Sequence, residues 1–272
     1  MQKVSDVELG KIKRWVVSLN VGGPGTGKTH NSATYPKSFF IITEPNSSET
    51  FMIKPELRKN VVAYEYFIPD PADGDRSLKS MYGDVKTSTI IKEINLAKEM
   101  ALKGEIETLV IDNITYLVLN KWMHISKYEI QYSKQGEINK MAMYSALRDW
   151  CYDFMLNYVL NFKGNIVVNS HEALESDEAM DKKIDKTTDI VPSILGGFRN
   201  DILGLFSNVF FLTKEVVKEN GKDTYKYYAR TNKGNQRNAK NRFNLPPVIE
   251  NPSYEVIREA IEKSIVTKKE IK

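Results

Sequence analysis

The feature that most constrains this chain is a glycine-rich loop near its N-terminus, "VGGPGTGKTH", at residues 21–30. Gly22 is followed, after four residues, by Gly27, Lys28 and Thr29, which is the pattern of a phosphate-binding loop. Glycines are needed there because a Cβ atom would keep backbone N–H groups away from phosphate oxygens at a helix N-terminus. The residues expected to bind a nucleotide are Gly22, Gly23, Pro24, Gly25, Thr26, Gly27, Lys28, Thr29 and His30.

The residues around the loop have the periodicity that such a site requires. Apolar side chains alternate along residues 14–20, which predicts a buried strand that ends where the glycines begin. Residues 29–36 can form only a short helix, because Pro36 stops it. This context favours a phosphate site over a purely structural glycine turn.

Apolar strands alternate with helical stretches along most of the chain, which predicts an α/β fold with a mostly parallel central sheet and helices on both faces. Residues 173–200 are mixed in charge and are expected to form a long mobile segment. We expect one core domain over residues 1–250 and a C-terminal helical tail over residues 251–272. Further strands are expected over 38–44, 60–68, 107–115 and 165–172, with a C-terminal β-hairpin over 208–217 and 224–231 that turns at Asn220-Gly221.

Composition excludes several classes of protein. The 272 residues include 39 Lys and Arg against 35 Asp and Glu, so a net charge of +4 does not by itself indicate a polyanionic partner. Cys151 is the single cysteine, which excludes an internal disulfide, and three scattered histidines lack the spacing of a zinc site. No secretory leader and no apolar stretch of about 18 residues is present, so we expect a cytoplasmic protein with no membrane partner.

A metal-binding acid is expected at Asp112. The apolar run "TLVI" delivers this residue at the C-terminal end of a strand, where open α/β sheets bind their ligands. The hydroxyl of Thr29 would complete the Mg²⁺ shell, and Lys28 would bridge the β- and γ-phosphates. The other interpretation of Asp112 is a cap for the helix that follows.

Two other predicted strands also end in polar residues. Glu44 closes "FFIITE", and a carboxylate there could orient and partly deprotonate an attacking water. The strand "NIVVNSHE" ends with Asn169, Ser170 and His171. A solvated loop acid for Glu44 and a purely structural histidine for His171 remain the alternatives.

The C-terminal third is rich in basic residues. Lys240 and Arg242 are two residues apart and lie on the same side if the chain is extended, from where they could reach a neighbouring subunit's γ-phosphate. A solvated basic strand is the alternative. Two stretches mix cations with aromatic rings, as single-strand binding requires. They contain Tyr225, Lys226, Tyr227, Tyr228, Arg230, Lys233, Arg237, Lys240 and Arg242, and Lys182, Lys183, Lys186, Phe198 and Arg199.

Together these motifs resemble the RecA-like P-loop ATPases. They are most similar to the compact phage-encoded branch of nucleotide-binding or AAA-domain proteins that includes phage RecA-like single-strand annealing proteins. The resemblance covers roughly residues 12–250. It rests on "GGPGTGKT", "FIITEP", "LVIDNIT", "VVNSHE" and "AKNRFNLP", and generic P-loop kinases lack the last of these.

The resemblance implies a Mg²⁺-dependent ATPase that acts on single-stranded DNA in phage recombination or replication. It implies a homo-oligomer with ATP between subunits, in the host cytoplasm, with phage single-strand binding or other replication and recombination proteins as partners. In AAA+ and ABC-type ATPases the hydrolytic glutamate follows the metal aspartate, but here that residue is Asn113, which favours the RecA-like subclass. The implied roles are metal binding for Thr29 and Asp112, hydrolysis for Glu44, γ-phosphate sensing for His171 (with Asn169 as second choice), and contact with a neighbouring subunit for Lys240 and Arg242.

Two other functions remain open at this point. A P-loop kinase of a small metabolite would need an arginine-rich lid, and no compact lid of that kind is visible in the sequence. A loader or assembly protein that is switched by ATP without hydrolysing it would fit if Glu44 were misplaced.

Overall fold

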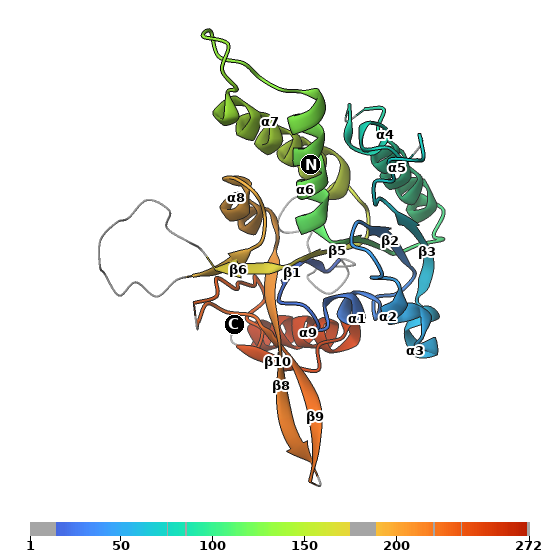
Figure 1. Cartoon of the computed structure of the whole chain (residues 1–272). Coiled ribbons are helices and arrows are strands. Elements are labelled where there is room, and N and C mark those ends of the chain that lie inside the picture. The colour runs from blue at the N-terminus through green and yellow to red at the C-terminus, as the bar shows by residue number, and fades with distance from the viewer. Residues whose placement is uncertain are drawn as a thin grey trace, which may run out of the picture.

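Figure 1 shows the computed structural model of the chain. It describes residues 15–74, 76–84, 86–174, 189–219, 221–234 and 236–270, with the backbone alone described from residue 265.

The described residues form a central eight-stranded sheet in the order β10-β9-β8-β1-β5-β4-β2-β3. All neighbouring strands from β8 to β3 are parallel, whereas β9 and β10 are added in antiparallel fashion at one edge. The mostly parallel sheet expected from the sequence is therefore confirmed. The strands are β1 (Val17–Val21), β2 (Ser38–Ile42), β3 (Val61–Tyr66), β4 (Thr108–Asp112), β5 (Asn165–Ser170), β8 (Asn208–Glu219), β9 (Lys222–Arg230) and β10 (Val248–Glu250).

Helices cover both faces of this sheet, as predicted (Figure 1). On one side lie α4 (Leu78–Tyr82), α5 (Thr89–Leu102), α6 (Ile114–Tyr128), α7 (Lys140–Asp153), the π-helical segment η2 (Phe154–Val159) and α8 (Phe198–Leu205). On the other side lie α1 (Lys28–Ser32), α2 (Glu49–Met52), α3 (Pro55–Arg58) and α9 (Tyr254–Glu270).

Side chains of the central strands alternate between two hydrophobic clusters. In β4, Leu109 and Ile111 belong to the first cluster, whereas Val110 belongs to the second. Successive side chains of a strand point to opposite faces, so a strand buried on both faces reads as a continuous apolar run. This is why "TLVI" and "SFFII" could be recognised as strands from sequence.

The expectation of a long mobile segment at residues 173–200 is wrong at both of its ends. β6 (Glu172–Leu174) pairs antiparallel with β7 (Ile190–Pro192), and α8 follows. Phe198, at the start of α8, is 1% exposed within the first cluster. The mixed charge of residues 173–200, taken as a whole, obscured the apolar residues at the C-terminal end that pack in the core. Residues 175–188 of the segment lie outside the described residues.

The predicted C-terminal hairpin is present as β8 and β9. Gly221 at its turn has a φ of 77°, a left-handed conformation that glycine adopts without steric cost, and Asn220 lies outside the described residues. Only the first half of the hairpin lies within the sheet, and its far half projects from the body of the molecule (Figure 1). Val216 and Tyr225, partners across this far half, are 60% and 59% exposed.

The segment after β10 is attached to α1. The side-chain amide of Asn31 donates to the carbonyl of Pro252 at 3.0 Å, and the Tyr254 N–H donates to Thr34 Oγ1 at 2.8 Å. Ile257 and Ile261 of α9 then pack in the second cluster. Among the described helices, none has the length and apolarity to cross a bilayer.

Candidate nucleotide site

The glycine loop joins the end of β1 to the first residue of α1. A Cβ atom on Gly22 would lie 2.6 Å from the carbonyl oxygen of Leu212 in β8, so no larger residue fits there. Gly27 has a φ of 88°, and a Cβ on it would lie 3.1 Å from the ring of Tyr227. The sequence pattern is therefore explained by contacts with the hairpin as well as by the space that phosphate oxygens need.

The ammonium group of Lys28 is held inside this loop. Its Nζ donates hydrogen bonds to the carbonyls of Gly22 at 2.8 Å and Gly23 at 2.9 Å, and the residue is only 6% exposed. Burial lowers the pKa of Lys28, while the negative charges of Asp112 and Glu44 act to raise it. A cation surrounded by backbone carbonyls and carboxylates at this point is positioned to neutralise phosphate charge.

The two predicted metal ligands lie in contact. Thr29 Oγ1 donates to Asp112 Oδ2 at 2.8 Å, and the hydroxyl of Ser47 donates to the same oxygen. Hydroxyl and carboxylate oxygens are the hard donors that Mg²⁺ prefers, and Mg²⁺ in such sites is held by few protein groups, with phosphates and waters completing its shell.

A network of buried polar side chains fixes Asp112 from behind. Asn169 Nδ2 donates to Asp112 Oδ1 at 3.0 Å, and Asn169 Oδ1 accepts from Ser32 Oγ at 3.1 Å and from Asn20 Nδ2 at 3.2 Å. Asn20 in turn donates to Asn31 Oδ1 at 3.0 Å. Asn169 therefore orients the carboxylate of Asp112, the predicted metal ligand, from within the sheet.

Three neighbouring strand ends place Glu44, Asn113 and His171 together. His171 Nε2 lies 3.2 Å from Glu44 Oε1, and Asn113 Nδ2 donates to Glu44 Oε2. Asn113 also accepts the N–H of Tyr116 at 3.1 Å and so caps α6, which means that the helix cap is not Asp112. The Asp112–Asn113 peptide bond is cis.

The surroundings of Glu44 keep its carboxylate ionised. Burial acts to raise its pKa, but the hydrogen bond and charge of His171, the charge of Lys28 and the hydrogen bond from Asn113 together hold the pKa below its usual value. An ionised carboxylate can orient a water molecule and accept a proton from it. It is not suited to donating a proton.

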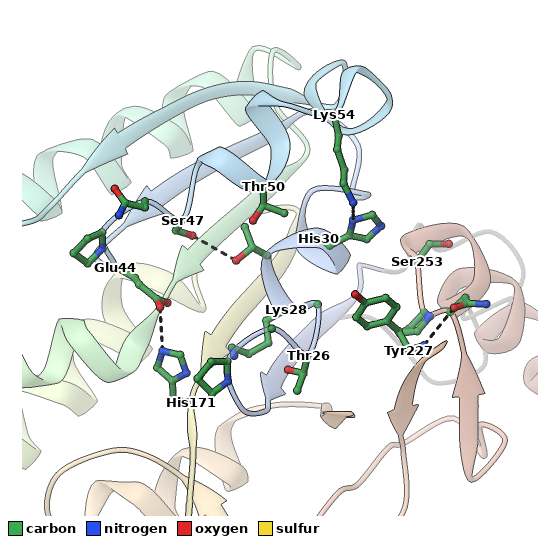
Figure 2. Close-up of a pocket in the computed structure, with 18 residues that line it drawn as sticks. Thr26, Lys28, His30, Glu44, Ser47, Thr50, Lys54, His171, Tyr227 and Ser253 are labelled. Carbon is green, nitrogen blue, oxygen red and sulfur yellow. Dashed lines mark hydrogen bonds and ion pairs between the residues drawn. The ribbon is translucent and has the colours of Figure 1, made fainter. Parts of the chain in front are cut away.

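Of these groups, Lys28, Thr29, Glu44, Ser47 and His171 line one pocket of about 460 Å³, a size typical of small-molecule sites. Asp112 and Asn113 hold Thr29 and Glu44 from behind and are not part of its lining. Figure 2 shows Glu44 and His171 at one end, Tyr227 and Ser253 at the other, and Lys28 between them. The second end is formed by segments far apart in sequence. Its lining includes His30, Lys54, Tyr227, Asn251, Pro252 and Ser253.

The predicted neighbour-facing cations lie apart from this pocket. Among the described residues, neither Lys240 nor Arg242 lines it. The backbone of Lys240 pairs with Val209 at the base of β8, while Arg242 is exposed. Burial, and then the charge of Arg242, lowers the pKa of Lys240.

Several residues of the two expected single-strand binding stretches have other partners. Lys226 pairs with Glu219 and Glu250 at 3.3 Å each, and Phe198 is buried in the core, so it is not a surface for base stacking. Tyr227 faces the glycine loop and lines the pocket. Lys182, Lys183 and Lys186 lie outside the described residues, whereas Tyr225 and Lys233 are exposed.

Sequence reasoning missed Ser47 and the pocket wall formed by Tyr227 and Asn251–Ser253. Ser47 lies in an irregular loop, and the one signal for it was a hydroxyl residue shortly after an acid at a strand end. Tyr227 was interpreted as a base-stacking residue of a surface hairpin. Its position over Gly27 depends on strand pairing that the local pattern does not specify.

The glycine loop, the parallel strands and the acids at the strand ends define the fold and site of a P-loop NTPase. Comparison with known families agrees with this class. Residues 16–243 match a family described as an AAA domain, and the chain belongs to that family.

Other comparisons add little. A solved KaiC-like protein from the hyperthermophilic archaeon Pyrococcus horikoshii OT3 has 14% sequence identity, with a TM-score of 0.40 over 79% of this chain and 78% of its own. A comparison with curated protein sequences finds no significant match.

Proposed function

We propose that this protein binds Mg·ATP and hydrolyses it to ADP and phosphate, with Glu44 as the base. The observation that carries the proposal is the position of Glu44. It lies in one pocket with the Lys28 ammonium, held in place by His171 and Asn113, and Asp112 bonded to Thr29 also lies at this end of the sheet.

Each group has a distinct part in this reaction. The N–H groups at the start of α1 bind phosphate oxygens, and Lys28 exchanges the carbonyls of Gly22 and Gly23 for phosphate oxygens. Glu44 orients a water for attack and takes up its proton, while His171 and Asn113 keep the carboxylate oriented. Mg²⁺, when bound at Thr29 and Asp112, would supply positive charge to the phosphates.

The nucleoside then belongs at the opposite end of the pocket from Glu44. Tyr227 offers a ring face there, and Asn251 and Ser253 offer polar groups. A hydrophobic ring face with a few polar groups is the usual composition of a nucleoside site.

We further propose that the ATPase acts on single-stranded DNA as a homo-oligomer, in phage recombination or replication within the host cytoplasm. The exposed position of Arg242 outside its own pocket supports a role toward a neighbouring subunit's γ-phosphate. Arg230, Lys233 and Tyr225 remain as surface groups for a strand, and phage single-strand binding or other replication and recombination proteins are the partners that fit such a role.

The direct test measures ATP turnover by the wild type and by Lys28→Ala, with and without single-stranded DNA. Mg²⁺-dependent turnover that is stimulated several-fold by DNA and lost in Lys28→Ala supports the whole proposal. Turnover only with a nucleoside or sugar acceptor indicates a kinase. Nucleotide binding without turnover indicates an ATP-switched loader, and both of these results contradict hydrolysis as the function.

A further inference from the structure

A pair of opposite charges lies beside the glycine loop and has no part in the proposed chemistry. Glu172 is the first residue of β6 and directly follows His171. Its Oε1 lies 3.4 Å from the place that a Cβ on Gly23 would occupy, and its Oε2 lies 3.5 Å from Nη2 of Arg237. The carboxylate is therefore between the loop and the guanidinium.

Both members of this pair are partly buried. The Glu172 and Arg237 side chains are 26% and 20% exposed. Glu172 Oε2 and Arg237 Nε are buried and have no hydrogen-bond partner within the described part of the chain. Since a buried charge without its partner is costly, each residue depends on the other for compensation.

The backbone holds Arg237 in this position. The N–H of Ile190 in β7 donates to the carbonyl of Gln236 at 2.7 Å, and Arg237 exchanges backbone hydrogen bonds with Gly234. β7 is in turn paired with β6, which begins at Glu172. The same small ribbon thus fixes both members of the pair.

The charge of Glu172 reaches the phosphate site. Together with Asp112 and Glu44, it acts to raise the pKa of Lys28, against the effect of burial. Glu172 Oε1 lies beside Gly23, and the carbonyl of Gly23 accepts a hydrogen bond from Lys28 Nζ at 2.9 Å. Lys28 is the residue that contacts the terminal phosphate in the proposed reaction.

We infer that Arg237 is the counter-charge that allows the glycine loop to accept a terminal phosphate, so that the Glu172–Arg237 pair sets the preference of the pocket for triphosphate over diphosphate. The inference rests on the proposed function. Without Arg237, the carboxylate of Glu172 competes for Lys28 and repels the γ-phosphate. A diphosphate carries less charge at this end and is affected less.

The test is to measure the affinity of the full chain for ADP and for a non-hydrolysable ATP analogue, each with Mg²⁺. Arg237→Gln should weaken binding of the ATP analogue by about tenfold or more, and that of ADP by much less, because one unpaired charge at short range is worth roughly that factor. Arg237→Lys should keep most of the preference. The double variant Glu172→Gln/Arg237→Gln should regain it, because the carboxylate that repels phosphate is gone.

A control separates this effect from loss of fold. Arg148→Gln breaks another arginine–carboxylate pair, with Asp201 at 2.8 Å, between α7 and α8. It should leave both affinities unchanged. Equal loss of both nucleotides in Arg237→Gln, or no recovery in the double variant, overturns the inference alone. A wild-type protein that binds neither nucleotide overturns the proposed function and the inference together.

Discussion

The 3.2 Å contact between His171 Nε2 and Glu44 Oε1 joins two strands that are not neighbours in the sheet. β4 lies between β2 and β5, and Asn113 at its end contacts both side chains. The polar side chains at three successive strand ends thus form one cluster at the carboxyl edge of the parallel sheet, where open α/β folds bind their ligands.

Glu44→Gln should lower kcat for ATP hydrolysis by about 100-fold or more, because the amide cannot take the proton of the attacking water. Binding of ATP should be retained. Single-turnover kinetics and nucleotide titration check the two effects separately. Glu49→Gln, at the exposed start of α2, is the matched control and should behave as wild type. Normal hydrolysis by Glu44→Gln would show that the base is another residue.

The pH dependence of hydrolysis should report the lowered pKa of Glu44. The pKa of Glu44 is lower in the folded than in the unfolded chain, so its ionised form stabilises the fold. This stabilisation is complete above the unfolded-state pKa and is lost as the pH falls through the folded-state pKa. Turnover should persist below pH about 4.3, the ordinary value for glutamate. His171→Asn removes the main lowering contact, so the acid limb of the pH–rate profile should move to higher pH. An unmoved limb, in a variant shown by circular dichroism to be folded, would contradict the assignment.

Removing the acid on the metal side should change the Mg²⁺ requirement. Asp112→Asn should raise the Mg²⁺ concentration needed for half-maximal nucleotide binding by about tenfold or more, and Ser47→Ala should raise it by less, since Ser47 only orients the carboxylate. Ser48→Ala is the control, because its hydroxyl contacts Tyr66 rather than Asp112. A Mg²⁺ titration of Asp112→Asn that matches wild type would exclude this residue as a ligand.

The buried network around Asn169 should contribute to stability as well as to the site. Asn169→Ala removes three hydrogen bonds and leaves Asn20 Nδ2 and Asp112 Oδ1 each short of a partner, whereas the Ser32 hydroxyl can still donate to the Lys28 carbonyl. We expect the free energy of unfolding to fall by about 3 kcal/mol. Asn157→Ala, on the exposed side of η2, should change it by less than about 0.5 kcal/mol. Urea denaturation measures both, and equal values would mean that the network is not stabilising.

A mixing experiment tests whether Arg242 acts between subunits. Arg242→Ala and Lys28→Ala should each be inactive alone, but together they should recover part of the activity, because one type of interface then contains an intact Lys28 and an intact Arg242. Co-assembly must first be shown by size-exclusion chromatography with an ATP analogue. Inactive mixed assemblies would assign Arg242 a role within its own subunit.

Much of the fold follows from local pattern. The central strands are buried on both faces, so β2, β4 and β5 appear as continuous apolar runs, and the glycine loop fixes where β1 ends. By contrast, β6 and β7 have three residues each, which is too short for an alternating pattern to be recognised. The two strands are also not adjacent in the sequence, so no hairpin turn marks their pairing.

Part of the candidate site could likewise be predicted from local sequence, and part could not. Lys28, Thr29, Asp112 and Glu44 stand next to strand ends and could be found from sequence. Ser47 lies in an irregular loop, where no periodicity marks it. Glu172 ends the motif "VVNSHE", but its contacts with Gly23 and with Arg237, 65 positions later, depend on how distant segments pack.

The attachment of residues 251–254 to α1 also bears on synthesis of the protein. The wall that carries Tyr227 and Ser253 is translated some 200 residues after the glycine loop that it faces. The Tyr227 end of the pocket therefore forms only after the chain has been synthesised past Ser253. A nascent fragment that stops before β9 lacks this wall, so a ligand that needs both ends of the pocket cannot assist folding until Ser253 has left the ribosome.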